Sequence, residues 1–168
     1  MTNDIDQYLS MLLSFTPCHK GNHRFSGDYV SLIHVPANGP EQVYSVVFND
    51  DSNVLTLARY CETVWEFLED CELVGSEDRS PEVNVLQTNI EKDHPVFSFL
   101  DLPFLLECQD HSDGEQGMDY YMLMWQKDGH ASVVESWEPY GRDDFHWMSL
   151  VGSMEVLASQ FEYAATAS

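Results

Sequence analysis

The sequence contains few basic residues. Only 7 Lys and Arg stand against 29 Asp and Glu in 168 residues, which gives a formal net charge of −22. A small domain stays soluble with a net charge of roughly 2–8 in magnitude, and charge of one sign opposes compaction through self-repulsion. The excess therefore indicates either a host environment that demands it or a positively charged partner. Direct binding to nucleic acid or to an anionic membrane is not expected, because both would be repelled.

Catalytic motifs are also missing from the sequence. It contains no phosphate-binding glycine loop, no dinucleotide fingerprint, no nucleophile elbow and no paired CxxC. We therefore predict that the protein is not an enzyme and uses no cofactor and no catalytic residue. A metal-dependent enzyme that works through its carboxylates is the less favoured alternative.

Long apolar segments and a basic leader are absent too. No stretch approaches the roughly 18 apolar residues of a membrane helix, and the N-terminus is acidic, unlike that of a secretory signal. Four cysteines are too few for a disulfide scaffold in a chain of this length, so we expect reduced thiols and a cytoplasmic protein. The cysteines are Cys18, Cys61, Cys71 and Cys108.

Two segments contain metal-ligand residue types without a full ligand pattern. Cys18, His19 and His23 are of the types that bind zinc, but no second Cys or His pair accompanies them. The segment 110–115 faintly resembles a calcium loop, yet it lacks the spacing of the first ligands and a Glu at the twelfth position. We predict no metal site in either segment and leave zinc binding by the first one open.

The sequence does contain enough apolar residues for a core. Hydrophobic residues make up 43% and aromatic residues 12% of the chain, which is typical of a globular protein and not of a disordered acidic tail. A length of 168 residues fits one domain. We therefore predict a single acidic globular domain over residues 1–168.

The pattern of apolar residues predicts helices and strands in alternation. Apolar stripes at helical spacing predict an N-terminal, a central and a C-terminal helix. Runs rich in β-branched and aromatic residues predict strands, and Asp128-Gly129 predicts the turn of a hairpin. Pro103 argues against one continuous helix over 95–108. The predicted helices cover residues 4–15, 61–73 and 145–163, and the predicted strands cover 29–35, 42–48, 83–90, 120–126 and 131–137, while 54–60 is either a strand or a helix start. This order predicts an α+β fold in which the three helices pack on a mainly antiparallel sheet.

The acidic residues fall into three clusters that we predict to bind a partner. The first lies at residues 62–82, where carboxylates follow one another on the exposed side of the central helix and like charges four residues apart cost about 0.2–0.5 kcal/mol per pair. The second lies at 101–119 and contains no Lys or Arg. The third, at 135–144, interleaves carboxylates with aromatic residues, as the anchors and rim of a protein interface do. The predicted partner-binding residues are Glu62, Glu66, Glu69, Asp70, Asp110, Asp113, Glu115, Glu135, Trp137, Glu138, Tyr140, Asp143 and Asp144.

These clusters favour a protein that neutralises a basic protein partner. In composition alone the chain is similar to bacterial immunity proteins, which are small, acidic and free of catalytic motifs, and the expected partner is then a cognate toxin, for example a nuclease, whose active site is blocked. The alternative is a nucleic-acid mimic, such as an anti-restriction or other phage-encoded inhibitor, which needs long regular rows of acids. A halophilic host is a third explanation of the acidity.

Overall fold

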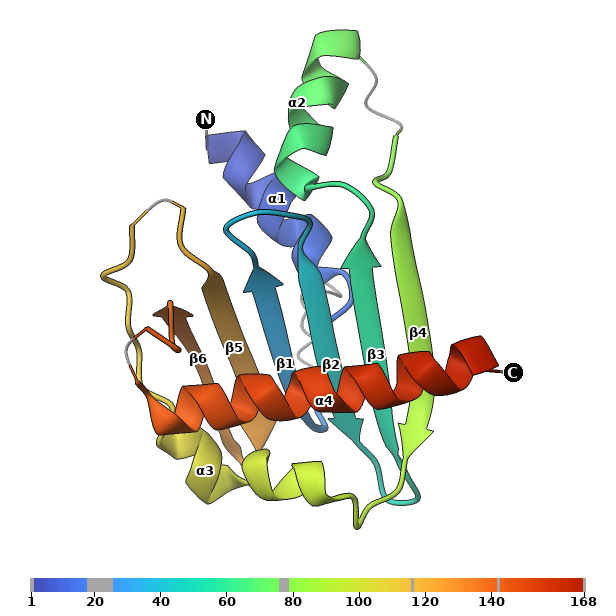
Figure 1. Ribbon diagram of the computed structural model, residues 1–168, viewed down its shortest axis with the longest axis vertical. Helices are drawn as coiled ribbons and strands as arrows, with labels where there is room; N and C mark the ends of the chain where they lie inside the picture. Colours follow the sequence, from blue (N-terminus) through green and yellow to red (C-terminus); the bar gives the residue numbers. More distant parts are fainter. Residues whose placement is uncertain (1, 18–25, 76–78, 116, 142, 168) are drawn as a thin grey trace.

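The protein is built on one sheet of six antiparallel strands with helices on both faces (Figure 1). The computed structural model describes residues 2–17, 26–75, 79–115, 117–141 and 143–167. The strand order is β4-β3-β2-β1-β5-β6. This arrangement confirms the predicted α+β class, the mainly antiparallel sheet and the three helices packed on it.

The strands follow the predicted segments closely. The turn of the predicted hairpin is confirmed, because Asp128 and Gly129 have φ angles of 49° and 78°, and a tight two-residue turn needs positive values at both positions. The ambiguous segment 54–60 is a strand. The bounds are β1 Asp28–Val35, β2 Gln42–Phe48, β3 Asn53–Tyr60, β4 Val83–Ile90, β5 Tyr120–Lys127 and β6 His130–Trp137.

The helices differ from prediction mainly at the start of the central one. It begins at Val64 rather than at Cys61, because the Thr63 hydroxyl accepts a hydrogen bond from the Glu66 amide and caps the first turn. Pro103 divides 95–108 into two short helices, as expected.

In the described ranges no helix is long and apolar enough to cross a membrane. The helices are α1 Thr2–Leu13, α2 Val64–Val74, the 3-10 helix η2 Pro95–Phe99, α3 Leu102–Leu106 and α4 Phe145–Ala167.

One face of the sheet is covered by α4, which runs across the strands, with η2 and α3 below it (Figure 1). Trp147 is fully buried there, and its indole N–H donates to the Gln109 carbonyl at 2.7 Å. Leu150 and Leu157 are also buried on this side of α4. These contacts form the larger of the two cores.

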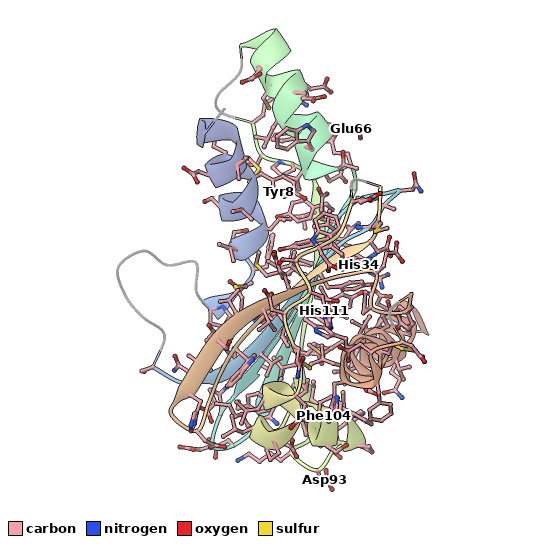
Figure 2. The ribbon with its side chains drawn as sticks, turned by 90° about the vertical axis from the view of Figure 1, so that its left-hand side faces the viewer. Tyr8, His34, Glu66, Asp93, Phe104 and His111 are labelled. Carbon is pink, nitrogen blue, oxygen red and sulfur yellow. The ribbon has the colours of Figure 1, made fainter. Side chains whose placement is uncertain are left out.

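The opposite face carries α1 near its upper half, with α2 above it (Figures 1 and 2). Leu12 of α1 is buried with Ile33 and Val43 of the sheet in a second, smaller core. A buried hydrogen bond of 2.8 Å joins the hydroxyls of Ser31 and Ser45 on this face. The two faces therefore differ in how fully helices cover them.

Candidate functional site

The antiparallel topology brings most of the predicted binding residues to one end of the sheet. Because neighbouring strands run in opposite directions, β1, β3 and β6 end where β2, β4 and β5 begin. We call this the α2 end. The first cluster follows β3, most of the second precedes β5, and the third follows β6. Figure 2 shows Glu66 at this end and Asp93 at the opposite one. Asp101 and Glu107 of the second cluster are exceptions, because they cap the two ends of α3.

The carboxylates of the first cluster line the exposed side of α2. Glu66, Glu69 and Asp70 are exposed, whereas Glu62 is half-buried and precedes the helix. The expected repulsion between Glu62 and Glu66 within one helix is therefore absent, and Glu66 instead accepts a hydrogen bond of 2.8 Å from the Thr63 hydroxyl. In the described part of the chain, no Lys or Arg forms an ion pair with these four residues.

Residues of the second cluster cover the edge of β6. The Asp110 carboxylate accepts the amide of Glu135 at 2.8 Å, and the His111 amide donates to the Glu135 carbonyl at 2.7 Å. His111 also forms a bridge with Ser136. The segment protects the sheet edge from pairing with another strand. Asp110 thus has a backbone partner, and Asp113 and Glu115 are exposed beyond it.

Three carboxylates of the third cluster have partners within the chain. Glu135 accepts the Tyr120 hydroxyl at 2.7 Å, and Glu138 accepts the Asp119 amide at 2.9 Å. Asp144 accepts the amides of the first turn of α4 and bonds to the His111 ring at 2.8 Å. Asp143 is exposed. Glu135 and Glu138 therefore stabilise the α2 end as well as giving it charge, whereas Asp144 stands at the start of α4, where His146 packs on Phe104 of α3.

Asp144 is held in its charged form. Burial by itself raises the pKa of this carboxyl, but the His111 hydrogen bond and the amides of Trp147 and His146 outweigh burial, so the pKa lies below its ordinary value. A negative charge is also favourable at the N-terminus of a helix. The link between Asp144 and His111 fixes the start of α4 to the segment at the edge of β6.

Aromatic residues lie among these acids, as the sequence analysis expected. Trp65 and Tyr140 are 44% and 49% exposed, and Trp137 is half-buried. Trp137 packs on Tyr120, with ring centres 4.8 Å apart. It also packs on Gly114 so closely that a Cβ there would lie 1.9 Å from the indole. Only glycine fits at that position, and the backbone of the 110–115 loop is thereby held against the indole.

The described cations are engaged within the chain. Arg59 pairs with Glu162 at 2.8 Å, and the Arg79 guanidinium lies 5.7 Å from the centre of the Phe67 ring. At the other end of the sheet, the Lys127 ammonium lies over Phe48, and the Lys92 ammonium donates to a backbone carbonyl in the β2–β3 turn. Of the basic residues that the structure describes, none neutralises the exposed acids of α2.

An apolar groove opens at the α2 end between α1 and the sheet. Its volume is about 330 Å³, and it is walled by Tyr8 and Leu9 of α1, by Pro36, and by Met118, Tyr120 and Trp137. The hydroxyl of Tyr120 donates to Glu135, which places a carboxylate beside the groove. The groove was not predicted from the sequence, because its walls come from segments far apart in the chain.

A buried carboxylate, Glu41, is hydrogen-bonded to Tyr8, one of the residues that wall the groove. Glu41 is only 3% exposed, and it accepts the Tyr8 hydroxyl at 2.9 Å and the Val64 amide at 2.8 Å. Burial, and next the charge of Glu41, raise the pKa of Tyr8 far above its ordinary value, so the hydroxyl stays a donor. Glu41 therefore joins α1 to the first turn of α2, a role that no local sequence pattern indicated.

Neither a metal site among the described residues nor a similarity to a known protein assigns a function to this end of the sheet. Among the described residues, no group of three or more His, Cys, Asp or Glu is placed to hold a metal ion. Cys18, His19 and His23, for which zinc binding was left open, lie outside the described residues. Comparisons with protein-family models, with curated proteins and with solved structures find no match for this chain.

Proposed function

We propose that this chain is an acidic binding protein that neutralises a basic protein partner in the cytoplasm. The form we favour is an immunity protein that blocks the active site of a bacterial toxin, possibly a nuclease. Neither catalysis nor a cofactor has a part in this proposal. The partner is recognised by its positive surface and is held by contacts with aromatic residues of the α2 end.

One observation carries the proposal: acids of all three clusters lie at the α2 end, and the cations described there, Arg59 and Arg79, lie against Glu162 and Phe67 rather than against these acids. Exposed Glu69, Asp70 and Glu115 lie there without a Lys or Arg partner among the described residues. A net charge of −22 destabilises a compact chain by self-repulsion. The exposed acids of the α2 end add to that repulsion and give no gain within the monomer, but a cationic partner relieves it.

The charges and the aromatic residues would act at different steps of binding. A surface of one sign steers a partner of opposite charge and raises the association rate, most strongly at low salt. Well-packed aromatic anchors mainly slow dissociation. Trp65, Trp137 and Tyr140 lie among the acids and would serve as these anchors. This mixed surface is the reason we prefer a protein partner to imitation of nucleic acid, for which regular rows of charge are needed.

Affinity capture with two matched variants tests the proposal. The full chain is immobilised in native lysate of the host at low salt, with the product of the neighbouring gene co-expressed. One variant neutralises the α2 end (Glu69→Gln, Asp70→Asn, Glu115→Gln), and the other neutralises the same number of exposed acids at the opposite end (Asp51→Asn, Glu91→Gln, Asp93→Asn). We expect one basic protein to bind the unmodified chain and the second variant, and to bind the first variant much more weakly.

The result also separates the proposed function from its alternative. If no basic protein is recovered, the proposal fails. If several unrelated DNA-binding proteins are recovered and DNA displaces each of them, the chain is a nucleic-acid mimic instead. Equal loss of binding in both variants would mean that net charge, rather than the α2 end, attracts the partner.

A further inference from the structure

We propose that the apolar groove receives one large apolar side chain from a basic segment of the partner, with Lys or Arg on either side of that residue. This inference rests on the proposed function and names the segment that the protein would recognise. It is drawn from the shape of the groove, from the apolar residues around it and from the charges at its rim.

The groove has the size and lining of a pocket for one side chain. Its volume of about 330 Å³ lies at the lower end of the range of binding pockets, roughly 300–1,000 Å³. Its walls are almost entirely apolar, and the Tyr8 and Tyr120 hydroxyls are already bonded to Glu41 and Glu135. A polar occupant would therefore lose its bonds to water without gaining new ones, whereas an apolar side chain loses nothing.

Exposed apolar residues extend the groove onto the surface. Met118 is one of its walls and is 37% exposed. Ile5 is 55% exposed and lies one helical turn before Leu9, on the same side of α1. Trp65 packs edge-on against Tyr8, with ring centres 5.8 Å apart. Single exposed apolar residues are ordinary, but a continuous group beside a groove is typical of an interaction site.

The charge of the rim indicates what accompanies the apolar side chain. Glu135 bonds to Tyr120, and Glu115 stands two residues before the groove residue Gly117. On the α2 side, Glu69 accepts the Trp65 indole N–H at 2.9 Å, and Trp65 contacts Tyr8. No Lys or Arg is among the described residues that wall the groove. Acids thus stand on both sides of an apolar opening, and the complementary ligand has cations on both sides of an apolar residue.

The same charge argues against other occupants of the groove. A second copy of this chain would bring another net charge of −22 to a surface that is already acidic, and like charges facing each other cost several kcal/mol. Fatty acids and anionic lipid headgroups would meet the same repulsion. A basic segment is therefore the occupant that the surface favours.

Two synthetic peptides test the inference on the full chain. Lys-Arg-Phe-Arg-Lys supplies the apolar residue between cations, and Lys-Arg-Ser-Arg-Lys has the same charge without it. Each is titrated at low salt while the methyl resonances of Met118 and Met122 report on the groove walls. Because transfer of a Phe side chain from water into an apolar pocket is favourable, we expect the Phe peptide to bind at least about tenfold more tightly and to shift both methyl resonances.

A groove-filling variant provides the control. Ala37 lines the groove, and the hydrogen bond that its backbone amide donates to the Asp119 carboxylate does not involve its side chain. In Ala37→Phe we expect the preference for the Phe peptide to disappear while binding of the Ser peptide is unchanged. Ala131→Phe, at the far end of β6, should keep the preference. Leu9→Trp fills the groove from the side of α1 and repeats the test if Ala37→Phe does not fold.

The outcomes distinguish this inference from the proposed function. If both peptides bind equally and the Met118 and Met122 resonances stay in place, the groove is not the site and the inference is overturned, while an acidic surface for a basic partner still stands. If neither peptide binds at low salt, both the inference and the charge-based proposal fail. If the preference survives in Ala37→Phe and in Leu9→Trp, the apolar side chain binds somewhere else and the inference is wrong.

Discussion

The two faces of the sheet are built from the same strands, yet they are covered differently. The face under α4 is closed: Trp147, Leu150 and Val151 have no exposed surface and pack on strands from across the sheet. The face under α1 is closed only in part, because a groove of about 330 Å³ remains between Leu9, Met122 and Trp137. Figure 2 shows α4 on one side of the sheet and α1 and α2 on the other.

Under the proposed function, stability depends mainly on the α4 face and binding uses the α1 face. Apolar surface that stays open forgoes about 25 cal/mol per Å² of stabilisation. The α1 face forgoes part of this stabilisation where the acids gather, which is the position an interaction site would occupy. The α4 face forgoes little. We therefore expect substitutions on the α4 face to lower the free energy of unfolding, and substitutions on the α1 face to weaken binding of the partner.

The largest expected difference is between two tryptophans. Trp147→Ala removes a fully buried ring and its bond to Gln109, and it should lower the free energy of unfolding by about 3–5 kcal/mol. Trp65→Ala removes a half-exposed ring and should cost about 1 kcal/mol or less. Urea unfolding followed by far-UV circular dichroism measures both. Equal losses would mean that the α2 end is as tightly packed as the core.

Two neighbouring residues of β5 allow the two faces of the sheet to be compared within one strand. Leu123 faces α4 and is fully buried, whereas Met122 faces the groove and is half-buried. Leu123→Ala should cost about 2–5 kcal/mol because it leaves a cavity. Met122→Ala should cost less than half as much, because the groove is already open beside it. A larger loss for Met122→Ala in the same unfolding assay would contradict the assignment of the core.

The buried carboxylate between α1 and α2 should give a smaller effect. Glu41→Ala leaves the Tyr8 hydroxyl and the Val64 amide without acceptors, at a cost of about 2–3 kcal/mol. Glu41→Gln retains one carbonyl oxygen and should lose about half of that. Hydrogen exchange should show faster opening of α1 and α2 in Glu41→Ala, with α4 unaffected. Uniform acceleration across the sheet would show that Glu41 serves the whole fold rather than this junction.

The smallest expected effect is the pH dependence at Asp144. Its folded pKa is lowered from 3.8, so the charged form contributes stability above that value, and this contribution disappears as the pH falls through the folded pKa. Asp144→Asn keeps a capping side chain but has no charge. The difference in unfolding free energy between the two proteins should therefore be constant above about pH 5 and shrink below pH 3.8. A difference that grows on acidification would refute the link with His111.

Local sequence patterns predict the elements better than they predict the site. Asp128-Gly129 indicates its hairpin turn directly. Thr63 and Glu66 form a capping pattern, which marks Val64 as the start of α2. The meeting of the acid clusters depends on the strand order, which no local pattern encodes. The groove and Glu41 join segments that are far apart, such as Tyr8 and Glu41, 33 positions from each other. The sequence also does not show that Glu135, Glu138 and Asp144 have hydrogen-bond partners within the chain, because these partners come from other segments.

Mapping a captured partner onto the two faces tests whether a basic protein binds the α1 face rather than the α4 face. The full chain is used to isolate its basic partner at low salt, and amide hydrogen exchange is then compared between the free and bound chain. We expect the partner to be released by salt and protection to increase in α1, in α2 and around 117–120, while the exposed side of α4 is unchanged. Protection confined to α4, or a partner that is not basic and stays bound at high salt, would contradict it.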